Sequence, residues 1–156
     1  MLSLSIEPTL RVATDADHAI VVTLIAALVD ELGPADVASR VIERLDDDVR
    51  RALVSPAVRI FLAEADGRAI GLGRADVLTA DPIFRLRDDH RCGYVDQMYV
   101  ITAYRDRGLG TKLLACCEAW FRSQGIGHAL LHAAPKAQSF YARLGYQPNR
   151  ELFKRL

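Results

Sequence analysis

The segment Val95–Leu114 changes from a strand pattern to a helix pattern, and two glycines stand where the pattern changes. Apolar residues then recur at helical spacing: Leu109, Leu113, Leu114, Cys117, Trp120 and Phe121. Gly108 and Gly110 fall where the first helical N–H groups lack an intrahelical partner. Glycine permits positive φ and close approach of a ligand to the backbone. We therefore expect a strand, a polar turn with exposed amides, and a helix.

The rest of the chain predicts several further elements around this segment. Thr14, with Asp17 three positions on, is typical of a helix start, and Gly33-Pro34 ends that helix. Asp66-Gly67 between two apolar runs is a hairpin signal. Strands are predicted at about 9–13, 58–65, 68–78, 92–101, 128–132 and 152–156, and helices at about 14–32, 35–53, 108–124 and 137–144. This order favours an α+β fold with a mixed sheet and helices on both faces.

Composition narrows the class of protein. With 156 residues, half of them hydrophobic, we expect one domain spanning 1–156. Lys plus Arg equal Asp plus Glu at 20 each, so charge gives no reason to expect nucleic acid or a membrane as partner. No apolar run approaches roughly 20 residues, and the first residues do not read as a signal peptide. Three cysteines without a metal-binding spacing favour a reducing, cytoplasmic compartment.

The turn before the third helix has the chemistry of an anion site. The helix dipole places partial positive charge at its start, and Arg105, Arg107 and Lys112 add to it. A dinucleotide fingerprint needs a third glycine where Leu113 stands, and a P-loop needs Gly-Lys-Ser/Thr. The pattern therefore predicts a diphosphate site of another type, with an ordinary glycine-rich helix start as the alternative.

Three segments resemble one known family. Arg105-Asp-Arg-Gly-Leu-Gly110 resembles the coenzyme A signature [Arg/Gln]-x-x-Gly-x-[Gly/Ala] of the GNAT acetyltransferases, and Val95–Val100 resembles the strand before it. Leu131–Tyr146 resembles the C-terminal motif of that family. The resemblance covers about residues 9–156. It implies the GNAT acyl-CoA N-acyltransferase fold, with about six to seven strands, and a cytoplasmic enzyme that moves an acetyl group to an amine.

The resemblance also implies where the cosubstrate acetyl-CoA binds, without a metal. In the family the pantetheine arm enters between two strands that separate at a bulge, and its amides pair with exposed strand backbone. The residues implied for this contact are Met98, Tyr99 and Val100, and we expect the side chains of Met98 and Tyr99 in the core. The residues implied for the diphosphate are Arg105, Asp106, Arg107, Gly108, Leu109, Gly110 and Thr111.

Two residues match catalytic positions of the family. Tyr141 matches the usual general acid, which protonates the departing thiolate, and packing of the ring alone is the alternative. Asp96 matches a common base position and would act through a water or by holding the amine. A strand-edge aspartate in an ion pair explains Asp96 equally well, and His90 and His132 are other possible bases. Ala134 stands where many relatives carry an asparagine, so no site is assigned there.

The acceptor is the least constrained partner. Acidic and basic residues alternate in the loop before the fourth predicted strand, where they could bind an ammonium or a carboxylate: Asp81, Asp88, Asp89, Arg85, Arg87 and Arg91. A solvated charged loop explains them as well. The leading hypothesis is acetyl transfer to a small-molecule amine by direct attack in a ternary complex. The alternatives are a protein or peptide N-acetyltransferase and a non-catalytic acyl-CoA-binding module. A homodimer is possible by resemblance.

Overall fold

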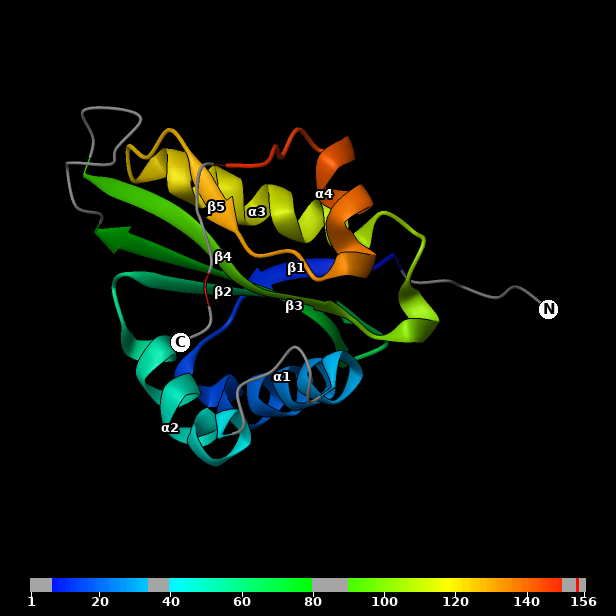
Figure 1. Ribbon diagram of the computed structural model, residues 1–156. Coiled ribbons are helices and arrows are strands. Elements are labelled where there is room, and N and C mark those ends of the chain that lie inside the picture. Colours follow the sequence, from blue (N-terminus) through cyan, green and yellow to red (C-terminus); the bar gives the residue numbers. More distant parts are fainter. Residues whose placement is uncertain (1–6, 34–39, 80–89, 150–153, 155–156) are drawn as a thin grey trace.

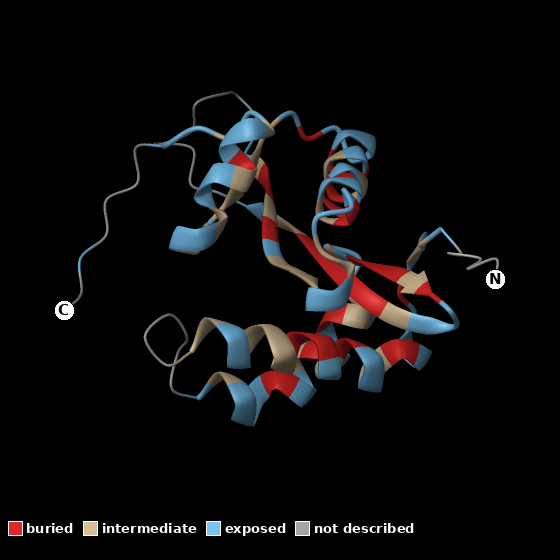
Figure 2. Cartoon of the chain, turned by 90° about the vertical axis from the view of Figure 1, so that its right-hand side faces the viewer, coloured by how far each residue is buried: buried red, intermediate tan, exposed pale blue. Residues whose placement is uncertain are grey.

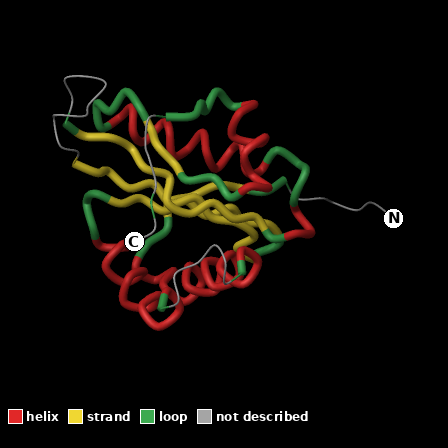
Figure 3. Tube along the Cα trace, in the orientation of Figure 1, coloured by secondary structure: helices red, strands yellow, loops and turns green. Residues whose placement is uncertain are grey.

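One mixed sheet forms the centre of the protein. A computed structural model describes residues 7–33, 40–79, 90–149 and 154. The strands of the sheet follow the chain order β1-β2-β3-β4-β5 (Figure 3). Their bounds are β1 Thr9–Val12, β2 Val58–Ala65, β3 Arg68–Thr79, β4 Arg91–Val100 and β5 Ala129–Leu131. Neighbouring strands are antiparallel up to β4, whereas β5 runs parallel to β4. The sheet is therefore mixed, as predicted.

Helices cover both faces of this sheet (Figure 1). α1 (His18–Leu32) and α2 (Val41–Val54) lie on one face, and α3 (Leu109–Ser123) and α4 (Gln138–Arg143) lie on the other. Short 3-10 turns precede or link them: η1 (Asp15–Asp17), η3 (Thr102–Tyr104) and η4 (Pro135–Ala137). The predicted capping pair forms, because the carboxylate of Asp17 accepts a 2.8 Å hydrogen bond from the Thr14 N–H.

The sheet separates two hydrophobic clusters, and Figure 2 shows buried segments in the strands and in the helices on either side of them. Leu62 and Leu72 belong to the cluster against α1 and α2. The other cluster contains the apolar stripe of α3. A Cβ on Gly93 would stand 2.6 Å from the ring of Phe121, so this glycine allows α3 to approach β4 closely.

Most predicted elements are confirmed, with differences at their ends and faces. The Asp66-Gly67 turn joins β2 to β3 with positive φ at both residues, 51° and 70°. Ile42 is 56% exposed, because α2 packs through Leu45 and Val49 instead. The predicted start of α2, most of the loop before β4 and nearly all of the last strand lie outside the described residues. Within the described part, no helix combines the length and the apolar character that a membrane span needs.

Candidate active site

β4 leaves β5 in the middle of its length. The two strands pair at three positions, the last being Val95 with Leu131, whereas β4 continues to Val100 in register with β3. The β3–β4 register shifts at the same place, because Arg74 pairs with Gln97 and the next residue of β3 pairs with Val95. Asp96 is therefore the extra residue of a β-bulge. The bulge and the separation of the strands coincide.

The turn after β4 has a backbone suited to an anion. Asp106 and Gly108 have positive φ, 59° and 76°, and Gly108 caps α3 without a side-chain hydrogen bond. The first helical bond runs from the Lys112 N–H to the Gly108 carbonyl, at 3.1 Å. The amides of residues 109–111 therefore have no partner further back in the helix. They lie at the positive end of the α3 dipole, which favours a bound diphosphate.

The cations predicted for this turn are used in different ways. Arg105 binds the carboxylate of Glu31 on α1 through both terminal nitrogens, at 2.8 and 2.6 Å, and donates from Nε to the Val100 carbonyl at 2.7 Å. Arg107 lies over the ring of Tyr104. Neither Arg107 nor Lys112 forms an ion pair with any residue in the described ranges. These two side chains can meet a phosphate without first losing a carboxylate partner.

The side chains of the strand residues pack in the core, as expected from the sequence. Met98 and Val100 pack in the α3 cluster, and Tyr99 packs in the α1–α2 cluster. Any role of these residues toward a ligand therefore falls to their backbone, on the edge that β5 no longer covers beyond Val95.

Tyr141 of α4 reaches toward the middle of α3. It is 9% exposed and touches the rings of Phe140 and Tyr146 edge to face. Burial, with a smaller contribution from Cys117, raises the pKa of Tyr141 to about 12. In the described part of the chain no residue forms a hydrogen bond with its hydroxyl. The phenol thus stays protonated at neutral pH and has its proton available for a partner.

Asp96 forms the ion pair that the alternative interpretation expected, with partners that the sequence did not identify. Its Oδ2 is 3.5 Å from Nε of Arg74 and accepts a 3.0 Å hydrogen bond from Gln97. Arg74 is buried and also binds Asp76 on β3 and Asp48 on α2. Desolvation raises the pKa of Asp96, Arg74 opposes this, and the other two carboxylates add to it. Because 32% of the side chain remains accessible, solvent screens much of the shift.

The histidines considered as bases lie in different places. His132 follows the end of β5, and its Nδ1 is 2.6 Å from the hydroxyl of Tyr94 on β4. His90 is exposed just before β4 begins. Most of the charged candidates for acceptor binding lie outside the described residues: Asp81, Asp88, Asp89, Arg85 and Arg87. Arg91 is described and donates to the Gln124 carbonyl at 2.9 Å. His132 is thus the histidine nearest the end of the β4–β5 pairing.

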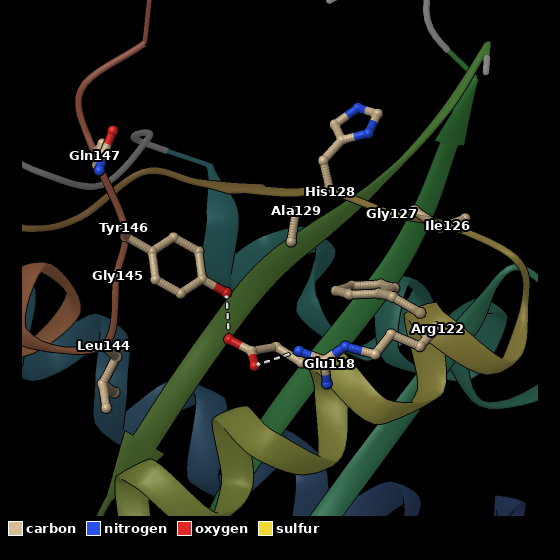
Figure 4. Close-up of a pocket in the computed structure, with 11 residues that line it drawn as sticks. Glu118, Arg122, Ile126, Gly127, His128, Ala129, Leu144, Gly145, Tyr146 and Gln147 are labelled. Atoms are coloured by element: carbon tan, nitrogen blue, oxygen red, sulfur yellow. Dashed lines mark hydrogen bonds and ion pairs between the residues drawn. The ribbon is translucent and has the colours of Figure 1, made fainter. Parts of the chain in front are cut away.

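A separate pocket of about 330 Å³ opens at the far end of α3 (Figure 4). Glu118 and Arg122 form part of its wall, with Tyr146 donating to Glu118 at 3.1 Å. None of the predicted catalytic or cofactor-binding residues lines it. The predicted site residues therefore lie outside this pocket. No group of three or more metal-binding side chains occurs among the residues whose positions are described.

Comparison with known proteins gives consistent relatives. A Bacillus subtilis (strain 168) protein whose name places it among acetyltransferases is 32% identical over 69 residues, which cover 44% of this chain and 47% of that protein. The match thus spans about half the length of the relative. A GCN5-related N-acetyltransferase from Ralstonia eutropha JMP134 is 25% identical with a TM-score of 0.85, covering 96% of this chain and 98% of that one.

A second solved structure shares the fold at lower identity. It is a predicted acetyltransferase from Clostridium acetobutylicum with acetyl-CoA, 18% identical, with a TM-score of 0.85 and 96% of each chain covered. The sequence model of the acetyltransferase (GNAT) family matches residues 25–146, which include both the turn before α3 and Tyr141. The fold predicted from the resemblance is confirmed, and the chain belongs to the acetyltransferase (GNAT) family.

Proposed function

We propose that the protein transfers the acetyl group of acetyl-CoA to a primary amine of a small molecule, by direct attack in a ternary complex. The observation that carries the proposal is the coincidence of two features. The uncapped amides at the start of α3 follow the β4 segment that β5 no longer covers, with η3 and one turn between them. A single extended ligand with a diphosphate and a chain of amides fits both.

On the cofactor side, the amides of residues 109–111 hold the diphosphate, with help from Arg107 and Lys112. The backbone of Met98–Val100 pairs with the pantetheine amides, and one of its N–H groups polarises the thioester carbonyl. Arg105 acts mainly by joining the end of β4 to α1, because Glu31 and the Val100 carbonyl already occupy its guanidinium.

The chemistry moves three protons. The acceptor ammonium loses one proton to solvent, directly or through a water, while Asp96 holds the amine at the bulge. The neutral nitrogen then forms the bond to the acetyl carbon, the carbon–sulfur bond breaks, and Tyr141 supplies a proton to the departing thiolate. The second proton lost by the acetylated nitrogen restores the phenol. A phenol with a pKa of about 12 is a weak acid. The proton transfer therefore depends on thiolate charge developing beside the hydroxyl.

The acceptor class rests on the charges on the α1–α2 face. Asp76 and Asp96 outnumber Arg74 there, which favours an acceptor that arrives as a cation. Proteins of similar fold divide between acceptor classes. One is an aminoglycoside N-acetyltransferase solved with CoA, at 19% identity, and another is a ribosomal-protein-alanine N-acetyltransferase from Brucella melitensis, at 17%.

Two measurements test the proposal in sequence. Calorimetry of the folded protein with CoA should give a 1:1 complex. A thiol-release assay with acetyl-CoA should then show turnover with at least one member of a panel of amines, polyamines, amino acids and peptide N-termini. Turnover of peptides alone would indicate a peptide acetyltransferase. Binding without turnover would indicate a non-catalytic acyl-CoA-binding module, and absence of CoA binding would refute the enzyme altogether.

A further inference from the structure

A single buried guanidinium joins three carboxylates from three elements. Arg74 of β3 is 7% exposed. It binds Asp76 through two nitrogens, Nε to Oδ1 at 2.8 Å and Nη2 to Oδ2 at 2.9 Å. Its Nη1 lies 3.3 Å from Asp48 of α2, and its Nε lies 3.5 Å from Asp96 of β4. A buried charge with this many partners is held in one geometry.

The guanidinium stands across the β4 bulge. Arg74 pairs with Gln97, the residue after the bulged Asp96, and Val95 before the bulge is the last residue that pairs with β5. One side chain therefore reaches from the continuous β3–β4 ladder to the residue at which β4 and β5 separate. Its contacts lie on the α1–α2 face of the sheet, since Leu72 two residues earlier packs in that cluster.

The charges make Arg74 necessary at this place. One guanidinium faces three carboxylates, and the only other cation with an ion pair to them within the described ranges is the exposed Arg51, at 3.4 Å from Asp48. Without Arg74, Asp76 and Asp96 would face each other as like charges in a partly buried region. Among the residues that the structure describes, Asp96 would then keep only its hydrogen bond from the neighbouring Gln97.

We propose that Arg74 is the positioning residue of the acetyl-transfer site, whose guanidinium fixes the β4 bulge and holds the Asp96 carboxylate where β4 leaves β5. This inference rests on the proposed function of Asp96 toward the acceptor amine. Arg74 itself touches neither substrate. The competing explanation is that Arg74 only anchors α2 to the sheet through Asp48.

Two substitutions separate these explanations. Arg74→Lys keeps the charge but removes the two-pronged contact that fixes the guanidinium between Asp76 and Asp96. Asp48→Asn weakens the contact with α2 and leaves the bulge contacts in place. Five titratable groups have to be considered when the titration of Asp96 is interpreted. They come from β3, α2, β4 and the end of β5: Arg74, Asp76, Asp48, Tyr94 and His132.

The experiment compares the parent, Arg74→Lys and Asp48→Asn by three measurements. These are CoA affinity by calorimetry, the pH dependence of kcat/KM with the best amine, and the ¹³C-carboxyl NMR titration of Asp96. In Arg74→Lys we expect CoA affinity to stay within about threefold, kcat to fall roughly tenfold to 100-fold, and the Asp96 titration to move to higher pH. The acidic limb of kcat/KM should move in the same direction.

Asp48→Asn should lower the urea midpoint, keep kcat within about twofold and leave the Asp96 titration near or slightly below its parental position. An unmoved Asp96 titration in Arg74→Lys would overturn the proposal, and so would equal losses of kcat in the two variants. Were the parent to turn over no amine, the proposed function would fail. The NMR titration would still decide whether Arg74 holds Asp96, so the two failures are distinguishable.

Discussion

A methyl group added at Gly108 gives a direct test of the diphosphate site, with a matched control elsewhere in the chain. Gly108 has φ of 76° and Gly67 in the β2–β3 hairpin has φ of 70°. A Cβ at either position would meet no atom within 4 Å. Alanine at both sites therefore suffers the same backbone strain without a clash, but only Gly108 lies at the start of α3.

The expected loss of stability is equal at the two sites. A Cβ in the left-handed region costs about 1 to 2 kcal/mol. Alanine also lowers the conformational entropy of the unfolded chain, which offsets about 0.4 to 1 kcal/mol of this cost. The net loss is roughly 1 kcal/mol for each variant, which in a chain of this length lowers Tm by about 2 to 4 °C. Urea unfolding of Gly108→Ala and Gly67→Ala measures it.

The effect on binding should differ. In Gly108→Ala the new methyl group occupies space through which the diphosphate approaches the amides of residues 109–111. We expect the Kd for CoA to rise at least about tenfold, equivalent to about 1.4 kcal/mol, with no change in Gly67→Ala. Calorimetry with CoA decides the matter. Parental affinity in Gly108→Ala, alongside equal destabilisation of both variants, would refute the placement of the diphosphate at this turn.

Three further substitutions test other parts of the structure. Tyr141→Phe should lower kcat by roughly 100-fold while CoA affinity, measured by calorimetry, is unchanged, and parental kcat at every pH would remove the acid role. Gly93→Ala should cost roughly 1 to 3 kcal/mol in urea unfolding, because the new Cβ would meet the buried Phe121 ring at 2.6 Å, and Gly93→Ala with Phe121→Leu should recover part of it. The hydrogen bonds from Arg11 hold the pKa of Asp17 at about 2, below its ordinary 3.8, so their stabilisation is present above pH 3.8 and is lost as the pH falls toward 2. Asp17→Asn should therefore lose roughly 2 kcal/mol near pH 6 and much less near pH 2, and a parent–variant difference independent of pH would contradict this.

Local signals in the sequence located the parts of the site that depend on local backbone. The glycines at 108 and 110 indicated the uncapped start of α3, and Asp66-Gly67 indicated the hairpin that orders β2 and β3. In both cases a few adjacent residues determine the conformation, because positive φ and missing intrahelical partners are properties of the turn itself.

Contacts between distant segments could not be predicted in the same way. The contact of Arg105 with Glu31, 74 residues earlier in the chain, has no signal in the local sequence. Arg74 reads in sequence as a polar residue of a strand, and only the packing of α2 and β4 against β3 brings its carboxylates together. The resemblance implied a bulge in this part of the sheet, but its place at Asp96 could not be predicted, because it arises from the register between two strands.

The positions of Tyr141 and Asp96 follow from what the sheet separates. Tyr141 packs with Cys117 in the α3 cluster, whereas the Asp96 carboxylate contacts Arg74 on the α1–α2 face. A continuous sheet would keep such groups apart, since each strand blocks passage between its faces. Beyond Val95 the β4–β5 ladder stops, so a ligand lying between the strands can meet both groups there. The proposed proton donor for the leaving sulfur and the carboxylate proposed to receive the amine can then act from opposite sides of one thioester, without competing for the same space.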